Sequence, residues 1–168
     1  LIADCQSFER AAHLRYVPMP GGEAAIRAPW RMALAHLRDA GEALDNLCKD
    51  IPPADVAVLQ RMMANQINSP LTSSCGRLFD AMAALLGVRR VVSYEGQAAI
   101  EMEWLAATER LNGEYPFTFD PDGQPMVIDT RPVIAAVVRD LTNGVSAASI
   151  ARRFHSTIAA IIAKVCCA

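Results

Sequence analysis

Residues 72–87 of the chain are TSSCGRLFDAMAALLG, and this stretch predicts the best-delimited helix of the protein. The hydroxyl residues at 72–74 are typical helix N-caps, and Gly87 is a typical stop. The apolar residues between these two ends recur at helical spacing and are Leu78, Phe79, Met82, Leu85 and Leu86. One face of this helix is therefore expected to lie in a core.

The chain before this stretch has the hydrophobic spacing of two more helices. We predict one long or broken helix over 27–48, with Gly41 as its weak point. Pro52 and Pro53 interrupt the pattern, and a second helix is predicted over 56–67. These two helices are expected to form an antiparallel pair.

The chain after this stretch has the spacing of three further helices. They are predicted over 97–111, 130–143 and 146–162. The expected core residues of the first of them are Ile100, Trp104 and Leu105. The sequence thus predicts about six helices.

Strand signals are few and short. Residues 7–20 are expected to be extended or to form a hairpin, and 126–128 are strand-like. The Pro- and Gly-rich region 114–129 is either a hairpin or a surface excursion. A chain of 168 residues is about one domain and buries roughly 68–70% of its unfolded surface. We therefore predict a mainly α fold with a few short strands.

Composition excludes several classes of protein. With 52% hydrophobic and 20% charged residues, the chain is too apolar for a disordered segment. Its net charge of −2 and the absence of a basic run argue against a nucleic-acid partner. Its apolar runs are far shorter than the roughly 18–20 residues of a membrane span. Because it begins at Leu1 without targeting features, we expect a fragment of a longer protein.

Cysteine and histidine usage points to a reducing compartment and to no metal site in this chain. The five cysteines are odd in number and lack C-x-x-C spacing, which favours a cytoplasmic location. His13, His36 and His155 lie far apart, without the spacing of zinc ligands. Cys75 has no histidine near it in sequence, so we do not expect a cysteine nucleophile.

The start of the helix at 72–87 has the residue types of a polar-ligand site. Ser74 and the free backbone N–H groups of the first turn favour anionic or polar ligands. Gly76 lets a ligand approach the backbone, and Asp80 follows one turn later on the same face. A carboxylate so placed could accept hydrogen bonds from two ribose hydroxyls. The alternative is an ordinary helix cap with a solvated Asp.

Glu95 and Gly96 precede the helix over 97–111 and repeat this pattern. Backbone without a Cβ at Gly96 could close over a nucleoside opposite Asp80. The alternative is a loop with a glycine turn.

Six stretches are distinctive: CQSFERAAHL at 5–14, PMPGGE at 18–23, PWRMA at 29–33, SPLTSSCGRLFD at 69–80, SYEGQAA at 93–99 and RFH at 153–155. Together they resemble the C-terminal region of the HypF-type hydrogenase-maturation carbamoyltransferases. The six stretches extend over essentially the whole chain.

This resemblance implies a multidomain cytoplasmic enzyme that makes carbamoyl-adenylate from carbamoyl phosphate and ATP. The carbamoyl group then passes to the C-terminal cysteine of a HypE-type partner and becomes the cyanide ligand of nickel-iron hydrogenase. The implied fold is the helical portion of an actin/hexokinase-like (ASKHA) α/β carbamoyltransferase domain, with 1–168 as a single fragment of it.

The resemblance also implies nucleotide binding by Ser74, Gly76, Asp80, Glu95 and Gly96. A zinc or iron site is expected before Leu1, and a glycine-rich nucleotide segment after Ala168. The fragment alone is therefore expected to be inactive and, with apolar surface uncovered, to self-associate.

Two alternatives stay open. One is a helical interaction module without a working ligand site. The other is an O-carbamoyltransferase or a tRNA threonylcarbamoyl transferase relative, although neither accounts for the stretches at 8–10 and 29–32.

Overall fold

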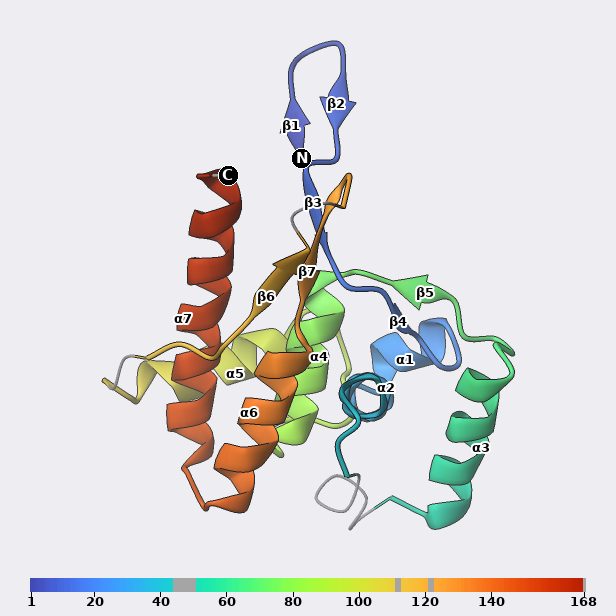
Figure 1. Ribbon diagram of the computed structural model, residues 1–168. Helices are drawn as coiled ribbons and strands as arrows, with labels where there is room; N and C mark the ends of the chain where they lie inside the picture. The colour runs from blue at the N-terminus through green and yellow to red at the C-terminus, as the bar shows by residue number, and fades with distance from the viewer. Residues whose placement is uncertain (44–50, 111–112, 121–122, 168) are drawn as a thin grey trace.

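A computed structural model describes residues 1–43, 51–110, 113–120 and 123–167. In Figure 1 a group of helices carries a small sheet at one end, and a thin N-terminal hairpin projects beyond that sheet. Both termini lie at the sheet end of the molecule. The expected class, mainly α with short strands, is confirmed.

The described residues form seven helices and seven short strands. The helices are α1 (Glu23–Arg27), α2 (Trp30–Ala40), α3 (Pro53–Ala64), α4 (Cys75–Leu85), α5 (Gln97–Ala107), α6 (Arg131–Thr142) and α7 (Ala147–Cys166). The strands are β1 (Ile2–Ala3), β2 (Phe8–Glu9), β3 (Ala12–Leu14), β4 (Val17–Pro18), β5 (Leu71–Thr72), β6 (Thr118–Asp120) and β7 (Met126–Asp129).

The helix predicted over 27–48 is broken at both ends of α2. Ala28 precedes a proline and takes φ −127 and ψ 76, outside the helical region, so α1 ends before Pro29. Gly41 takes the left-handed φ of 72 that ends α2. Residues 44–48 of this prediction lie outside the described residues, as do 111–112 at the end of the helix predicted over 97–111.

The predicted antiparallel pairing of α2 with α3 is wrong. Figure 1 shows α2 end-on while α3 lies in the plane of the view. Residues 32–37 of α2 are all buried, because α4 and α6 are its main neighbours. The buried residues of α3 are Val56, Leu59 and Met63. A helix that is apolar around most of its surface is surrounded by partners rather than paired with one.

The predicted core face of α5 is wrong for Ile100 and Trp104, while Leu105 is partly buried against the core as predicted. Trp104 is 63% exposed and Ile100 is 36% exposed. The buried residues at this spacing are Ala98, Met102 and Ala106, on the side that meets α4 and α7. The small alanine side chains allow these helices to approach closely. Because α5 has apolar residues on several faces, the hydrophobic pattern alone does not identify the face that is buried.

The central sheet has the order β3-β7-β6, with β3 parallel and β6 antiparallel to β7. The antiparallel β6 and β7 favour a hairpin, the first of the two alternatives predicted for this part of the chain. Leu14 pairs with Ile128, which is buried against the helices. The extended N-terminal region contains the β1–β2 hairpin, and β4 pairs with β5 directly before α4.

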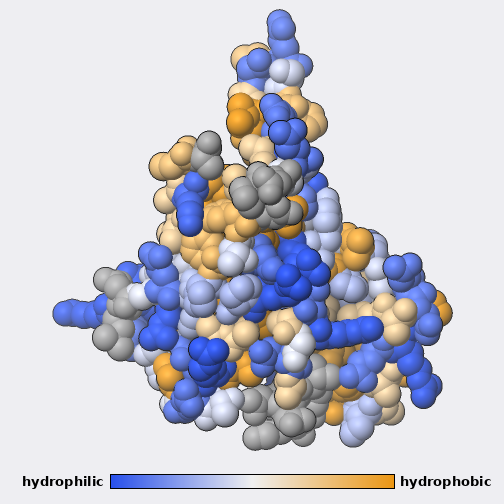
Figure 2. Space-filling model, viewed as in Figure 1, coloured by the Kyte–Doolittle hydropathy of each residue, from blue (hydrophilic) through white to orange (hydrophobic). Residues whose placement is uncertain are grey.

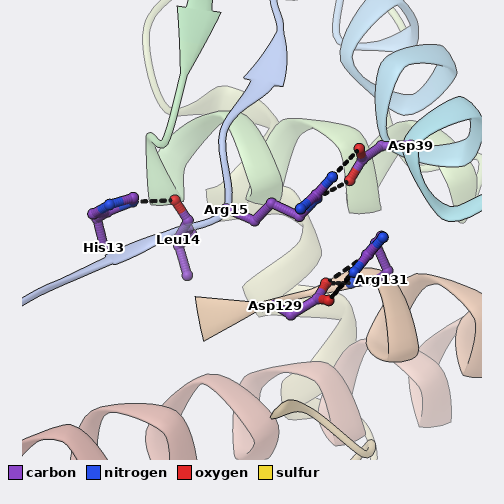
Figure 3. Close-up of polar contacts among 6 residues, drawn as sticks. All are labelled: His13, Leu14, Arg15, Asp39, Asp129 and Arg131. Carbon is purple, nitrogen blue, oxygen red and sulfur yellow. Dashed lines mark hydrogen bonds and ion pairs between the residues drawn. The ribbon is translucent and has the colours of Figure 1, made fainter. Parts of the chain in front are cut away.

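Ion pairs tie the ends of the parallel strands to two helices (Figure 3). Arg15, just after β3, donates to Asp39 of α2, with its Nε 2.9 Å from Oδ2. Asp129, at the end of β7, accepts from Arg131 at the start of α6, with Nε–Oδ1 at 3.0 Å. These hydrogen bonds from Arg131 lower the pKa of Asp129. Of these two pairs, Arg15–Asp39 links the sheet to a helix that is distant in sequence.

No helix within the described part of the chain is long and apolar enough to cross a membrane.

Candidate functional site

The start of α4 is built as the sequence predicts. Ser74 is the N-cap, and its Oγ accepts a hydrogen bond from the Arg77 backbone N at 3.4 Å. Gly76 is exposed, and a Cβ placed there would have, among the described residues, only the Ser74 Oγ within 4 Å. The backbone at Gly76 is therefore open to a ligand.

Asp80 departs from the expectation of an exposed carboxylate. It is 4% exposed, because α4 packs against both α2 and α5 and buries this side of the helix. Its Oδ2 lies 3.0 Å from Nη1 of Arg77, yet neither atom has a hydrogen-bond partner in the described structure. The two groups thus form an ion pair without hydrogen-bond alignment. Burial raises the pKa of Asp80 to about 6, and the charge of Arg77 opposes this shift.

The loop before α5 is held by a chain of polar contacts that the sequence analysis did not identify. Gln97 accepts from the Ser93 backbone N at 2.8 Å and donates to Glu101 at 2.9 Å. Glu101 in turn accepts two hydrogen bonds from Arg89, at 2.6 and 2.8 Å, which lower its pKa. The spacing of four between 97 and 101 was the available signal. This chain of contacts fixes the loop, and Gly96 permits its turn with φ 79.

A pocket of about 310 Å³ lies between this loop, the end of α1 and the start of α4. Its lining residues are Ile26, Arg27, Arg77, Val92, Ser93, Tyr94 and Glu95. The backbone N of Val92 donates to the Arg27 carbonyl at 2.9 Å and joins two of these walls. The two segments singled out in the sequence therefore meet at one cavity.

The sequence-predicted residues differ in how they relate to this pocket. Glu95 lines it, and Asp80 is linked to it through Arg77. Ser74, Gly76 and Gly96 flank its walls in sequence without lining it. Sequence reasoning missed the cationic lining residues Arg27 and Arg77. For Arg77 the only signal was its place beside Gly76.

A second, apolar groove of about 380 Å³ lies between the sheet and α7. Its lining includes His13, Cys75, Ile128, Ile158, Ile161, Ile162, Val165 and Cys166. Figure 2 shows apolar surface in this region, beside the C-terminal half of α7. Burial raises the pKa of the Cys75 thiol, which does not favour a nucleophile even though His13 lines the same groove.

Within the described residues, no group of three or more His, Cys, Asp or Glu side chains could hold a metal ion.

The chain matches known proteins along its whole length. A family model described as "Carbamoyltransferase, Kae1-like Domain, second subdomain" covers residues 1–168. Carbamoyltransferase HypF of Rhizobium leguminosarum bv. viciae is 39% identical over 167 residues, which are 97% of this chain and 21% of that protein. Carbamoyltransferase HypF2 of Cupriavidus necator is 46% identical over 108 residues, 63% of this chain and 13% of that protein.

Solved structures agree with this relationship. One, described as full-length HypF in the phosphate- and nucleotide-bound form, has a TM-score of 0.91 and 33% identity over 98% of this chain. It is matched over 21% of its own length, so the present chain spans about a fifth or less of these relatives. The predicted fold class, the helical portion of an actin/hexokinase-like carbamoyltransferase domain, is confirmed by these neighbours. Because the family model and a 39% identical relative both cover nearly the entire sequence, the chain belongs to the HypF carbamoyltransferase family, as the second subdomain of its Kae1-like domain.

Proposed function

We propose that the full-length parent transfers a carbamoyl group from carbamoyl-adenylate to the C-terminal cysteine of a HypE-type partner, in the synthesis of the cyanide ligands of nickel-iron hydrogenase. The adenylate is made in the same parent from carbamoyl phosphate and ATP. Support comes from the name carbamoyltransferase that the relatives carry, and from the related HypF structure that was solved in a phosphate- and nucleotide-bound form.

The transfer step is an acyl substitution at the carbamoyl carbon. The partner's cysteine loses its proton to solvent and its thiolate attacks this carbon, so that an S–C bond forms. The C–O bond to the adenylate phosphate breaks, and AMP leaves with the electron pair. We assign no nucleophile or base in this step to the present chain, whose Cys75 thiol has a raised pKa.

The role of this subdomain is to form one side of the nucleotide site. The observation that carries this role is the pocket where Arg77 of α4 meets the loop at 93–95. Glu95 lines this pocket, Ser74, Gly76 and Gly96 lie close in sequence to its lining residues, and the open backbone at Gly76 lets a nucleoside approach the start of α4. Asp80 accepts hydrogen bonds from the ribose hydroxyls while its Oδ2 stays beside Nη1 of Arg77.

The metal that the family resemblance implies, zinc or iron, does not fit this chain. The described residues provide no cluster of ligands for it. Its ligands belong to other segments of the parent. A cytoplasmic location belongs to the same proposal, because the cysteine usage suits a reducing compartment.

Calorimetric titration of ATP into the full-length parent tests the nucleotide role. The separate adenylate-forming domain is inactivated so that only the transfer site is measured. We expect Asp80→Asn and Gly76→Val each to weaken ATP binding about tenfold or more, since hydrogen bonds to charged groups contribute about 1.5–3 kcal/mol. Asp55→Asn, on exposed surface of α3, is the matched control. Unchanged affinity in a folded Asp80→Asn parent would favour a helical interaction module instead.

The transfer itself is tested with the intact parent, carbamoyl phosphate, ATP and the partner. Mass spectrometry should find a carbamoyl group on the partner's C-terminal cysteine. An unmodified cysteine with active adenylate formation would exclude this acceptor.

A further inference from the structure

The pocket lined by residues 26–27, 77 and 92–95 has more positive charge than the binding of an uncharged nucleoside would need. Two of its lining residues are arginines, and Glu95 is its one carboxylate. Among the described residues, neither Arg27 nor Glu95 has a side-chain ion pair. The Arg27 guanidinium is therefore available to an anion.

The guanidinium of Arg77 is largely buried and contains a donor without a hydrogen-bond acceptor among the described residues. Its side chain is only 13% exposed, and its Nη1 has no hydrogen-bond partner in the described structure. Buried donors are nearly always hydrogen-bonded, and leaving one unpaired is costly. Asp80 compensates the charge at 3.0 Å without satisfying this donor. A ligand acceptor in the pocket would satisfy it.

Both arginines stand on walls that are held in place. The Arg27 carbonyl accepts from the Val92 backbone N at 2.9 Å, and the Ser93 backbone N is held by Gln97 at 2.8 Å. The guanidinium of Arg77 is positioned by Asp80. The Arg77 guanidinium is thereby held at the pocket wall, and the exposed Arg27 guanidinium is free to turn toward it, so the two residues offer several N–H donors of the kind that suits phosphate oxygens.

We propose that Arg27 and Arg77 form an anion clamp that binds phosphoryl oxygens of the nucleotide, with Asp80 as the positioning residue of Arg77. This inference rests on the proposed nucleotide role and names the part of the ligand that this pocket binds. The clamp distinguishes phosphorylated from unphosphorylated nucleosides.

The test compares ATP with adenosine on the full-length parent, with the adenylate-forming domain inactivated. ATP is titrated directly, and adenosine is measured by competition against ATP. The variants are Arg27→Met, at an exposed position, and Arg77→Lys, which keeps the charge opposite Asp80. Arg139→Met, exposed on α6, is the matched control. Thermal unfolding confirms that each variant is folded.

We expect Arg27→Met and Arg77→Lys to raise the Kd for ATP by about tenfold to a hundredfold, as for the loss of a charged hydrogen bond. Adenosine competition should change less than about twofold, and the control should match the wild type.

Two results would overturn the clamp and leave the proposed function standing. One is unchanged ATP affinity in folded Arg27→Met. The other is an equal loss for ATP and adenosine, which would mean that the arginines shape the nucleoside site. If the wild-type parent fails to bind ATP at all under these conditions, the nucleotide role itself is wrong, and the clamp with it.

Discussion

Asp80 is a carboxylate that folding removes from water and leaves beside a single cation. Burial dominates its electrostatics and raises its pKa from 3.8 to about 6, despite Arg77 at 3.0 Å. A group with a raised folded pKa binds its proton more tightly in the folded state than in the unfolded state. For an acid, this means that its charged form opposes folding.

This sign gives a pH prediction. As the pH falls from 7 toward 4, the folded state takes up a proton at Asp80 before the unfolded state does, so stability due to this group rises. Thermal unfolding of the wild type and of Asp80→Asn at several pH values should therefore show the wild type gaining on the variant as the pH falls through about 6. A difference that stays constant from pH 4 to pH 7 would mean that Asp80 is not desolvated.

Tyr115 anchors the segment after α5 to the last two helices. It is 4% exposed, its hydroxyl donates to Asp140 at 2.8 Å, and Arg153 donates to the same carboxylate at 2.6 Å. Burial is the main cause of the raised pKa of Tyr115, and the hydrogen bond to Asp140 adds to it.

We expect Tyr115→Phe to lower the free energy of unfolding by about 1–3 kcal/mol, because a partly buried carboxylate loses a donor. Tyr94→Phe is the matched control, since Tyr94 is 52% exposed and its hydroxyl has no hydrogen-bond partner among the described residues. Urea unfolding of both variants is the measurement. Equal stability of the two would show that the Tyr115 hydroxyl contributes nothing.

At the scale of elements, α5 carries the clearest difference between pattern and packing. Its small and flexible residues face α4 and α7, while its tryptophan faces outward. In a helix with apolar residues on several sides, the hydrophobic pattern does not define one buried face, and the packing of neighbouring helices determines which side is buried.

Two substitutions test which face of α5 is buried. Met102→Ala should cost about 2–5 kcal/mol of stability, because it opens a cavity at a fully buried position. Trp104→Ala should change the stability by less than about 1 kcal/mol, because Trp104 is 63% exposed. Denaturant unfolding of both variants measures the two changes in stability. The opposite order would restore the inner face that hydrophobic spacing predicted.

At the scale of the molecule, the groove between the sheet and α7 leaves apolar surface in contact with water. The chain spans about a fifth or less of the three HypF relatives described above, so this surface is a candidate contact for other parts of the parent. Isolated from them, the 168-residue chain is expected to self-associate and to bind hydrophobic dyes.

Light scattering and dye binding of the isolated chain test this expectation. Ile162→Asp, at a groove position that is 57% exposed, should reduce both signals. Val58→Asp, at a 52% exposed position on α3 outside the groove, is the control and should leave them unchanged. A monomeric chain without dye binding at high concentration would show that the groove does not drive association.

The sequence by itself determined the helices at α4, α6 and α7, the strand at β7 and the family. The signals for these helices are local, namely the N-caps Ser74 and Ser146, Pro132 in a first turn, and helical spacing. The signal for the family is a set of short motifs in a fixed order along the chain. Such signals act within a few residues, so they can be interpreted before any packing is known.

Only the tertiary structure decided the parallel pairing of β3 with β7, the inner face of α5, the burial of Asp80 and the placement of Arg27 and Arg77 at one pocket. Each of these joins residues that are distant in sequence or depends on which neighbours cover a helix. Contacts across such separations are set by how whole elements fill a shared core, and no local pattern in the chain records that choice.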